Sequence, residues 1–193
     1  NWPDAVSTFS FWTSGSTGQP KEVNKPLSAM EYEVETLERA FGGSDMPQIM
    51  AGTVSHQHYY GASFRIFWPL LTKRQIWRDV LRYPMDMLCA GQRPVAIAST
   101  PSFLSRAVDL LPMIEMREMG HRLFSSGAPL DKDCGMKIAT KGGHQLLREI
   151  LGSTETGGVG YRCPNDNDKG ARGWSILPGV EVFIEDELIL IKS

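Results

Sequence analysis

Apolar residues in this chain recur with two different periods, which predict helices and strands in alternation. The clearest helical stretch follows Pro26. Its apolar residues recur at spacings of three and four, as on one face of an amphipathic helix: Leu27, Met30, Val34, Leu37 and Phe41. The helix also carries acidic residues, which we interpret as a solvated face: Glu31, Glu33, Glu35 and Glu38. Gly42-Gly43 is expected to end it.

Short apolar runs predict strands on both sides of this helix. The strands are expected at residues 6–12, 22–25, 48–54, 75–77, 94–98, 122–124 and 145–151. Further helices are expected at residues 64–71, at 85–90 and from Pro101, with Thr100 as the N-cap. Alternating runs at residues 178–184 and 187–191 flank Glu185-Asp186 and predict a β-hairpin. We therefore expect an α/β fold, a mostly parallel sheet flanked by helices, with a C-terminal β-hairpin.

The composition is that of a globular protein. The chain has 193 residues, of which 41% are hydrophobic and 22% charged, and we expect a single α/β domain over residues 1–193. The net charge of −2 provides no basic surface for nucleic acid or an anionic membrane. No apolar run approaches the roughly 18 residues of a membrane-spanning helix. We therefore expect neither a nucleic-acid partner nor a membrane span.

The cysteines point to a reducing compartment. Cys89, Cys134 and Cys163 are odd in number and form no C-x-x-C pair, so neither a disulfide framework nor a zinc site is indicated. No signal peptide is recognisable, and a cytoplasmic location fits best. Because the chain starts at Asn1 rather than at Met, we expect it to be part of a longer protein.

A loop rich in glycine and hydroxyl side chains follows the first predicted strand: Thr13-Ser14-Gly15-Ser16-Thr17-Gly18-Gln19-Pro20-Lys21. Successive backbone N–H groups in such a loop can form a nest for an anion, and Lys21 adds a compact positive charge. The P-loop of common NTPases needs G-x-x-x-x-G-K-[ST], whereas here Pro20 precedes the lysine and Glu22 follows it. A flexible Gly/Ser linker is the alternative. The preceding apolar strand and the Pro-Lys ending favour a phosphate-binding loop.

A second glycine turn, Gly152-Ser153-Thr154-Glu155-Thr156-Gly157-Gly158, follows the strand expected at residues 145–151. It places a hydroxyl beside a carboxylate, so the hydroxyl can donate to a phosphate oxygen and the carboxylate can hold Mg²⁺. The alternative is a helical capping box, with Ser153 as the cap and Thr156 inside the helix. Gly157-Gly158 argues against a helix here.

Two histidines and two tyrosines follow the strand expected at residues 48–54, in the order Ser55-His56-Gln57-His58-Tyr59-Tyr60-Gly61. Open α/β sheets bind ligands beyond the carboxyl ends of their strands, so this segment indicates a pocket wall. Two alternatives remain: His56 and His58 as metal ligands, or a histidine that fills the core.

Together these motifs resemble the adenylate-forming superfamily, which includes acyl-CoA synthetases, aryl-acid ligases, luciferases and peptide-synthetase adenylation domains. The loop matches the family pattern T-S-G-S-T-G-x-P-K throughout, and the resemblance extends from Val6 to Lys192. It implies that the loop binds the phosphates of ATP through Thr13, Ser14, Gly15, Ser16, Thr17, Gly18 and Lys21.

The resemblance implies roles for the later motifs too. Ser126-Gly127-Ala128-Pro129-Leu130 is similar to a G-G-A-P-L segment whose backbone lies against adenine, with serine in the first place. In the second turn, Gly152 and Ser153 would bind the nucleotide, Thr154 would contact the α-phosphate, and Glu155 would hold the metal.

His58 and Gly61 match an H-x-x-G pattern that lines the acyl pocket and the approach of the thiol in this family. The catalytic residues implied by the resemblance are therefore Lys21, Thr154 and His58. One position departs from the pattern. Leu151 stands where the family has an aromatic residue that stacks on adenine, so stacking here is weaker or comes from elsewhere.

The reaction implied is an ATP- and Mg²⁺-dependent activation of a carboxylic acid. The acid attacks the α-phosphorus of ATP, giving an acyl adenylate and pyrophosphate, and the thiol of CoA or of an acyl carrier protein's phosphopantetheine then takes the acyl group. The strings F-W-T-S-G-S-T-G-Q-P-K-E-V, H-Q-H-Y-Y-G and L-G-S-T-E-T-G-G are most similar to ligases of bacterial aryl-polyene pathways. An aromatic or unsaturated acid is implied.

The resemblance also bears on the extent of the chain. Residues 172–193 would be the hairpin that begins a small barrel, and the family's ribose-binding aspartate and C-terminal lid domain with its catalytic lysine are absent from the sequence. We therefore expect the 193 residues alone to be inactive. A CoA ligase is one enzyme alternative, and a non-catalytic nucleotide- or acid-binding remnant is the alternative from another class. A kinase-like ATPase would release phosphate rather than pyrophosphate.

Overall fold

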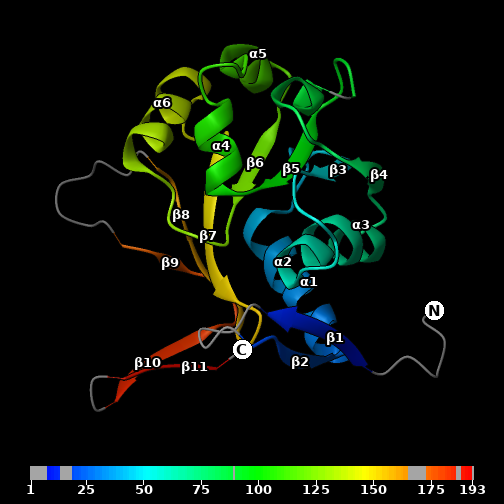
Figure 1. The fold of residues 1–193 in the computed structure, drawn as a ribbon, viewed down its shortest axis with the longest axis vertical. Coiled ribbons are helices and arrows are strands. Elements are labelled where there is room, and N and C mark those ends of the chain that lie inside the picture. Colours follow the sequence, from blue (N-terminus) through cyan, green and yellow to red (C-terminus); the bar gives the residue numbers. More distant parts are fainter. Residues whose placement is uncertain (1–7, 14–18, 89, 165–172, 186–187, 193) are drawn as a thin grey trace.

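The computed structural model of the protein describes residues 8–13, 19–88, 90–164, 173–185 and 188–192. Its centre is a seven-stranded sheet in the order β4-β3-β5-β6-β7-β8-β9, with helices packed on both faces (Figure 1). These strands are β3 (Ile49–Gly52), β4 (Gln75–Val80), β5 (Val95–Ser99), β6 (Arg122–Ser125), β7 (Leu147–Ser153), β8 (Gly157–Arg162) and β9 (Ser175–Ile176). Neighbours from β4 to β7 are parallel, and β8 and β9 are antiparallel. The expected α/β fold is confirmed.

Two antiparallel hairpins lie outside this sheet. β1 (Thr8–Thr13) pairs with β2 (Lys21–Pro26), so that Thr13 and Lys21 face each other across the loop. β10 (Glu181–Glu185) pairs with β11 (Leu188–Lys192), which confirms the expected C-terminal hairpin.

The helices are α1 (Leu27–Phe41), α2 (Tyr59–Ala62), the π-helix η1 (Ser63–Phe67), α3 (Trp68–Leu71), the 3₁₀-helix η2 (Pro84–Leu88), α4 (Pro101–Ala107), α5 (Met113–Glu118) and α6 (Lys132–Gly142). The Thr100 hydroxyl accepts the Phe103 N–H, which confirms the expected N-cap of α4. The helix expected at residues 85–90 is instead the short 3₁₀ turn η2. The Asp86 carboxylate accepts the backbone N–H groups of Arg82 and Tyr83 at 2.8 and 2.9 Å and holds that segment in a tight turn.

The sheet divides the interior into two cores. Successive β5 side chains point to opposite faces, so Val95 and Ile97 join one core while Ala96 and Ala98 join the other. The first core packs under α4, α5 and α6, and the second under α1, η1 and α3. Phe64, Trp68 and Phe124 are almost completely buried in the second core and contact one another through their rings. No helix among the described residues has the length and apolar character of a membrane span.

The acidic residues of α1 are not all solvated, which corrects the sequence interpretation. Glu38 accepts hydrogen bonds from Trp68 Nε1 at 2.7 Å and from both terminal nitrogens of Arg74 at 2.7 and 2.9 Å. The Arg74 side chain is only 5% exposed. The hydrogen bonds from Arg74 hold the pKa of Glu38 below its usual value. Glu33 is buried as well, and it lies at the site described below.

Replacing Glu38 by alanine is expected to destabilise the protein by about 2–3 kcal/mol. The change leaves the Arg74 guanidinium and the Trp68 indole N–H without their acceptor, and breaking a buried pair costs about 3–5 kcal/mol. The expected loss is smaller because the Glu38 side chain is 37% exposed. Denaturant unfolding measures the loss. Glu35→Ala is the matched control, because the Glu35–Arg39 pair on the same helix is exposed and should be worth less than about 0.5 kcal/mol.

His121 should make stability depend on pH. The side chain is completely buried, neither ring nitrogen has a hydrogen-bond partner among the described residues, and loss of hydration lowers its pKa. Below about pH 6.5 the unfolded chain binds a proton that the folded chain resists, so stability should fall by at most about 1.4 kcal/mol per pH unit. Urea unfolding of the wild type and of His121→Leu between pH 8 and 5.5 measures this effect. The wild type should lose more stability than the variant, and parallel losses would contradict the prediction.

Candidate active site

Three loops at the carboxyl ends of parallel strands enclose a cavity of about 150 Å³. They follow β3, β6 and β7, whose carboxyl ends share one edge of the sheet because the strands are parallel. The cavity is lined by Glu33, His58, Tyr59, Tyr60, Phe64, Ser126, Gly127, Ile150, Gly152, Ser153, Thr154, Gly157 and Gly158. The structure therefore brings together members of three separate sequence motifs. Ala128 and Pro129 are exposed and lie outside this lining.

The first and last motifs meet through an ion pair. Lys21 Nζ lies 3.6 Å from Glu155 Oε1, and both side chains are largely exposed. Lys25, further along β2, donates from Nζ to the backbone carbonyl of Glu155. Residues 14–18, the middle of the predicted phosphate loop, lie outside the described residues, so their predicted role stays a prediction.

The second motif is a tight turn between the antiparallel strands β7 and β8. The Ser153 N–H donates to Thr156 Oγ1 at 3.2 Å, and the Thr156 N–H donates to Ser153 Oγ at 3.1 Å. These are the reciprocal bonds of a capping box, yet the chain continues as β8 rather than as a helix. Gly157 allows this with a φ of 75°. The helical alternative is therefore wrong, and Thr154 and Glu155 are presented on a hairpin turn.

Glu155 has the properties of a magnesium ligand. Its side chain is 48% exposed. The carboxylate is ionised at neutral pH, and hydrogen bonding from its own backbone N–H, with contributions from Ser153 and Lys21, lowers its pKa further. The described residues contain no cluster of three metal-ligating side chains. One carboxylate completed by phosphate oxygens and water is a set of ligands that suits Mg²⁺.

Ser126 has a structural reason to differ from the glycine of the family pattern. It is buried, and its hydroxyl donates to the Ile150 carbonyl at 3.0 Å, which ties the end of β6 to β7. Gly127 follows with a φ of 94°, a left-handed conformation that glycine adopts without strain. Leu151 is 43% exposed at the same edge.

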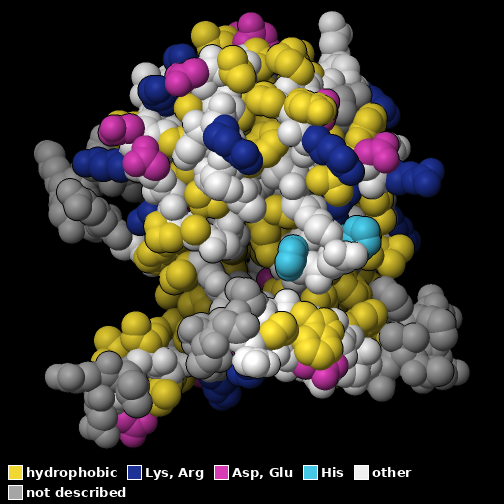
Figure 2. Space-filling view, viewed as in Figure 1, with side chains coloured by type: hydrophobic (Ala, Val, Ile, Leu, Met, Phe, Trp, Pro, Cys, Tyr) yellow, Lys and Arg dark blue, Asp and Glu magenta, His cyan; other side chains and the backbone are white. Residues whose placement is uncertain are grey.

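His58 precedes α2 and lines the cavity beside Tyr59 and Tyr60. His56 and His58 are both exposed, so neither fills the core, and Figure 2 shows histidine side chains at the surface beside a hollow in this face. The structure gives them no third metal ligand among the described residues. Gly61 has to be glycine, because a Cβ there would lie 2.0 Å from the Ser55 carbonyl oxygen.

Residues 3–189 match the family model described as AMP-binding enzyme. The chain belongs to this family. It is 30% identical over 155 residues to a 4-coumarate–CoA ligase of Rhodobacter capsulatus, covering 79% of this chain and 38% of that protein. It is 29% identical over 173 residues to a 4-coumarate–CoA ligase of Halorhodospira halophila, covering 84% and 39%. This member of the family thus spans less than half the length of these relatives.

Solved structures show the same fold. ATP-bound MatB from Rhodopseudomonas palustris has a TM-score of 0.75 at 20% identity, covering 92% of this chain and 35% of that one. The AMP complex of O-succinylbenzoate coenzyme A synthetase from Bacillus subtilis has a TM-score of 0.76 at 17% identity, covering 94% and 37%. The α/β core of this AMP-binding family member is therefore arranged as in these enzymes.

Sequence reasoning missed Glu33, which lies beneath the second motif. The sequence pattern predicts a solvated side chain, but Glu33 is only 8% exposed, and it accepts the Gly158 N–H with Oε1 at 3.2 Å and Oε2 at 3.0 Å. The spacing of Glu33 from the apolar residues of α1 does indicate that it is buried. Glu33 comes three residues after Met30 and four before Leu37, which places it beside the buried stripe of α1.

Proposed function

We propose that this chain is the core of an ATP-dependent ligase that activates a carboxylic acid as its adenylate and passes the acyl group to a thiol. The observation that carries the proposal is the Lys21–Glu155 pair, which joins the end of the predicted phosphate loop to the turn whose Thr154 lines the cavity. Family membership supports it, since the chain belongs to the AMP-binding enzymes.

The proposed roles follow from position and charge. Lys21 and the loop before it would hold the departing pyrophosphate, and Thr154 would donate to the α-phosphate. Glu155 would hold Mg²⁺, which when bound neutralises phosphate charge. Ser126-Gly127-Ala128-Pro129 would lie against adenine. No covalent nucleophile is needed, because orientation and charge stabilisation suffice for this displacement.

The cavity supports an uncharged acyl group. Its described lining includes Tyr59, Tyr60, Phe64 and Ile150 but no lysine or arginine that would pair with a second carboxylate. We therefore propose an aromatic or unsaturated monocarboxylic acid as the substrate. His58 at the cavity rim would lie on the path of the thiol, which is CoA or the phosphopantetheine of an acyl carrier protein. The relatives named 4-coumarate–CoA ligase favour CoA.

We also propose that β10 and β11 begin a small barrel beside the α/β core. Within the described residues these strands pair only with each other, and they expose Phe183, Ile184 and Ile189. Further strands would cover these side chains.

Exchange of labelled pyrophosphate into ATP tests the proposal. The protein in its natural full length should exchange label only when Mg²⁺ and an acid are present, faster with aromatic or unsaturated monocarboxylates than with dicarboxylates. CoA and a carrier protein bearing phosphopantetheine are then compared as acyl acceptors. Nucleotide binding without exchange would indicate a non-catalytic binder, and release of inorganic phosphate instead of pyrophosphate would indicate an ATPase.

A further inference from the structure

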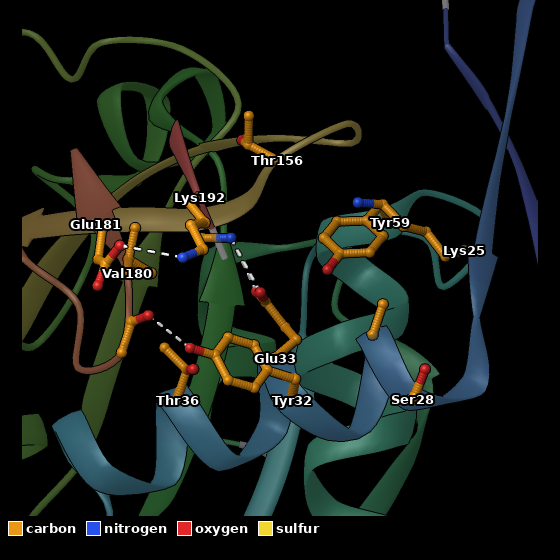
Figure 3. Close-up of a pocket in the computed structure, with 13 residues that line it drawn as sticks. Lys25, Ser28, Tyr32, Glu33, Thr36, Tyr59, Thr156, Val180, Glu181 and Lys192 are labelled. Carbon is orange, nitrogen blue, oxygen red and sulfur yellow. Dashed lines mark hydrogen bonds and ion pairs between the residues drawn. The ribbon is translucent and has the colours of Figure 1, made fainter. Parts of the chain in front are cut away.

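A buried carboxylate joins the separate segments that build the proposed active site. Glu33 projects from α1 into a larger hollow of about 410 Å³, beside Tyr59 and the start of β8 (Figure 3). It lines this hollow and the cavity described above, so it forms part of the wall between them. Its oxygens accept the Gly158 N–H, and Tyr59 lines both hollows together with it.

Each of these partners adjoins a residue with a proposed role. Tyr59 follows His58, and Gly158 lies just after the turn that carries Thr154 and Glu155. Lys25, on β2, lines the larger hollow together with Glu33 and Tyr59. Its Nζ lies 5.4 Å from the centre of the Tyr59 ring and donates to the Glu155 carbonyl.

Stability alone does not account for a carboxylate at this position. Burial raises the pKa of Glu33, while the Gly158 hydrogen bond, the neighbouring Tyr59 side chain and the charge of Lys25 oppose the rise. An apolar side chain beside Met30 and Leu37 would avoid this desolvation cost, and replacing buried ionic groups by apolar ones is often neutral or stabilising. The Glu33 carboxylate therefore carries a desolvation cost that packing of α1 does not require.

The start of β8 is shaped to admit this carboxylate. A Cβ on Gly157 would lie 2.6 Å from Glu33 Oε2, and one on Gly158 would lie 3.2 Å from Oε1. Because glycine has no side chain with which to anchor the turn, the backbone N–H of Gly158 is the group that Glu33 can hold. A hydrogen bond to a charged acceptor is stronger than one to a neutral acceptor.

We propose that Glu33 is a positioning residue that holds the Thr154–Glu155 turn against Lys21 and His58. The inference rests on the proposed ligase function. It explains why a buried carboxylate with no proposed catalytic role is bonded to the start of β8 and lies beside Tyr59. Displacing a reacting group by about 1 Å can cost on the order of 10²-fold in rate, so loss of this anchor should appear mainly in kcat.

Two substitutions of similar size separate anchoring from packing. Glu33→Met fills the space without an acceptor, whereas Glu33→Gln keeps an amide oxygen that can accept the Gly158 N–H. In pyrophosphate exchange by the full-length protein, Glu33→Met should lower kcat about 10- to 100-fold, with the KM of the acid within about two-fold. Glu33→Gln should stay within about three-fold of the wild type. An unchanged kcat for Glu33→Met, or equal losses in both variants, would overturn the proposal.

Hydrogen exchange provides a readout that does not depend on activity. The amides of residues 153–158 should exchange faster in Glu33→Met than in the wild type and Glu33→Gln, while those of β5 stay unchanged. Equal exchange at residues 153–158 in all three proteins would refute the anchor whether or not the enzyme is active. Absence of pyrophosphate exchange in the wild type, with this pattern intact, would instead refute the ligase function.

A pair of glycine substitutions tests the same anchor if Glu33→Met does not fold. Gly157→Ala places a methyl group against Glu33 at a φ of 75°. Gly91→Ala imposes similar backbone strain at a φ of 62°, but a Cβ there has nothing within 4 Å. Gly157→Ala should lower kcat at least 10-fold more than Gly91→Ala, and equal effects would count against the anchor.

Discussion

Replacing Glu155 by glutamine is expected to lower the rate of acid-dependent pyrophosphate exchange by about 10²–10³-fold, the range for losing one preorganised charge contact. The Glu155 carboxylate is ionised at neutral pH, hydrogen bonding from its own backbone lowers its pKa further, and glutamine removes that charge with almost no change in shape. Hard cations prefer charged oxygen ligands, so the variant should also need more Mg²⁺ for half-maximal rate. Rates measured over a Mg²⁺ titration at saturating ATP show both effects.

The free energy of unfolding of Glu155→Gln shows whether its lower rate comes from misfolding. The Glu155 side chain is 48% exposed and its ion pair with Lys21 is long, so unfolding should change by less than about 0.5 kcal/mol. Asp109→Asn is a matched control, because Asp109 is an exposed carboxylate paired with a lysine, Lys137, at 2.9 Å. It should leave the exchange rate and the Mg²⁺ dependence unchanged. A Glu155→Gln variant with wild-type rate and Mg²⁺ response would show that Glu155 does not hold the metal.

The arrangement of the sheet and its edge could be predicted because both depend on local patterns. The apolar run at residues 94–98 predicts β5 (Val95–Ser99) almost to the residue, and β5 is buried on both faces, as a central parallel strand must be. The glycine turn after β7 and the His58 segment after β3 lie at one edge because parallel strands end together. The Lys21–Glu155 contact follows from this geometry and from the β1–β2 hairpin.

Long-range pairing of polar side chains could not be predicted in the same way. Glu33 and Glu38 are glutamates on the same helix as the exposed Glu31 and Glu35, and although spacing places Glu33 beside the buried stripe, it does not show what either side chain contacts. Glu33 contacts a backbone N–H 125 positions away, and Glu38 contacts Arg74, 36 positions away. Such partners depend on how the helix rotates against the sheet, which hydrophobic spacing fixes only approximately. In an amphipathic helix such as α1, an acidic residue one turn from two core residues is therefore a candidate site residue.

Lys21→Ala is expected to slow pyrophosphate exchange by about 10²–10³-fold, with most of the loss in kcat. The lysine ends the phosphate loop, and it lies 3.6 Å from Glu155, so its charge is available to phosphate oxygens beside the proposed metal ligand. Negative charge that develops on the departing pyrophosphate is stabilised more in the transition state than in bound ATP, and such contacts raise kcat.

The prediction for Lys21→Ala is tested by its separate effects on kcat and KM and by a control substitution of another exposed lysine. The Lys21 side chain is 66% exposed, so unfolding in denaturant should change by less than about 0.5 kcal/mol. Lys141→Ala removes an exposed lysine from the last turn of α6, on the opposite side of the fold from the β1–β2 hairpin, and should leave the kinetics unchanged (Figure 1). Lys21→Arg keeps the charge but not its compact shape, and should recover only part of the rate. If Lys21→Ala raises the KM of ATP with an unchanged kcat, the lysine binds the nucleotide without assisting the departure of pyrophosphate. If stability falls while both constants hold, Lys21 serves the fold rather than the reaction.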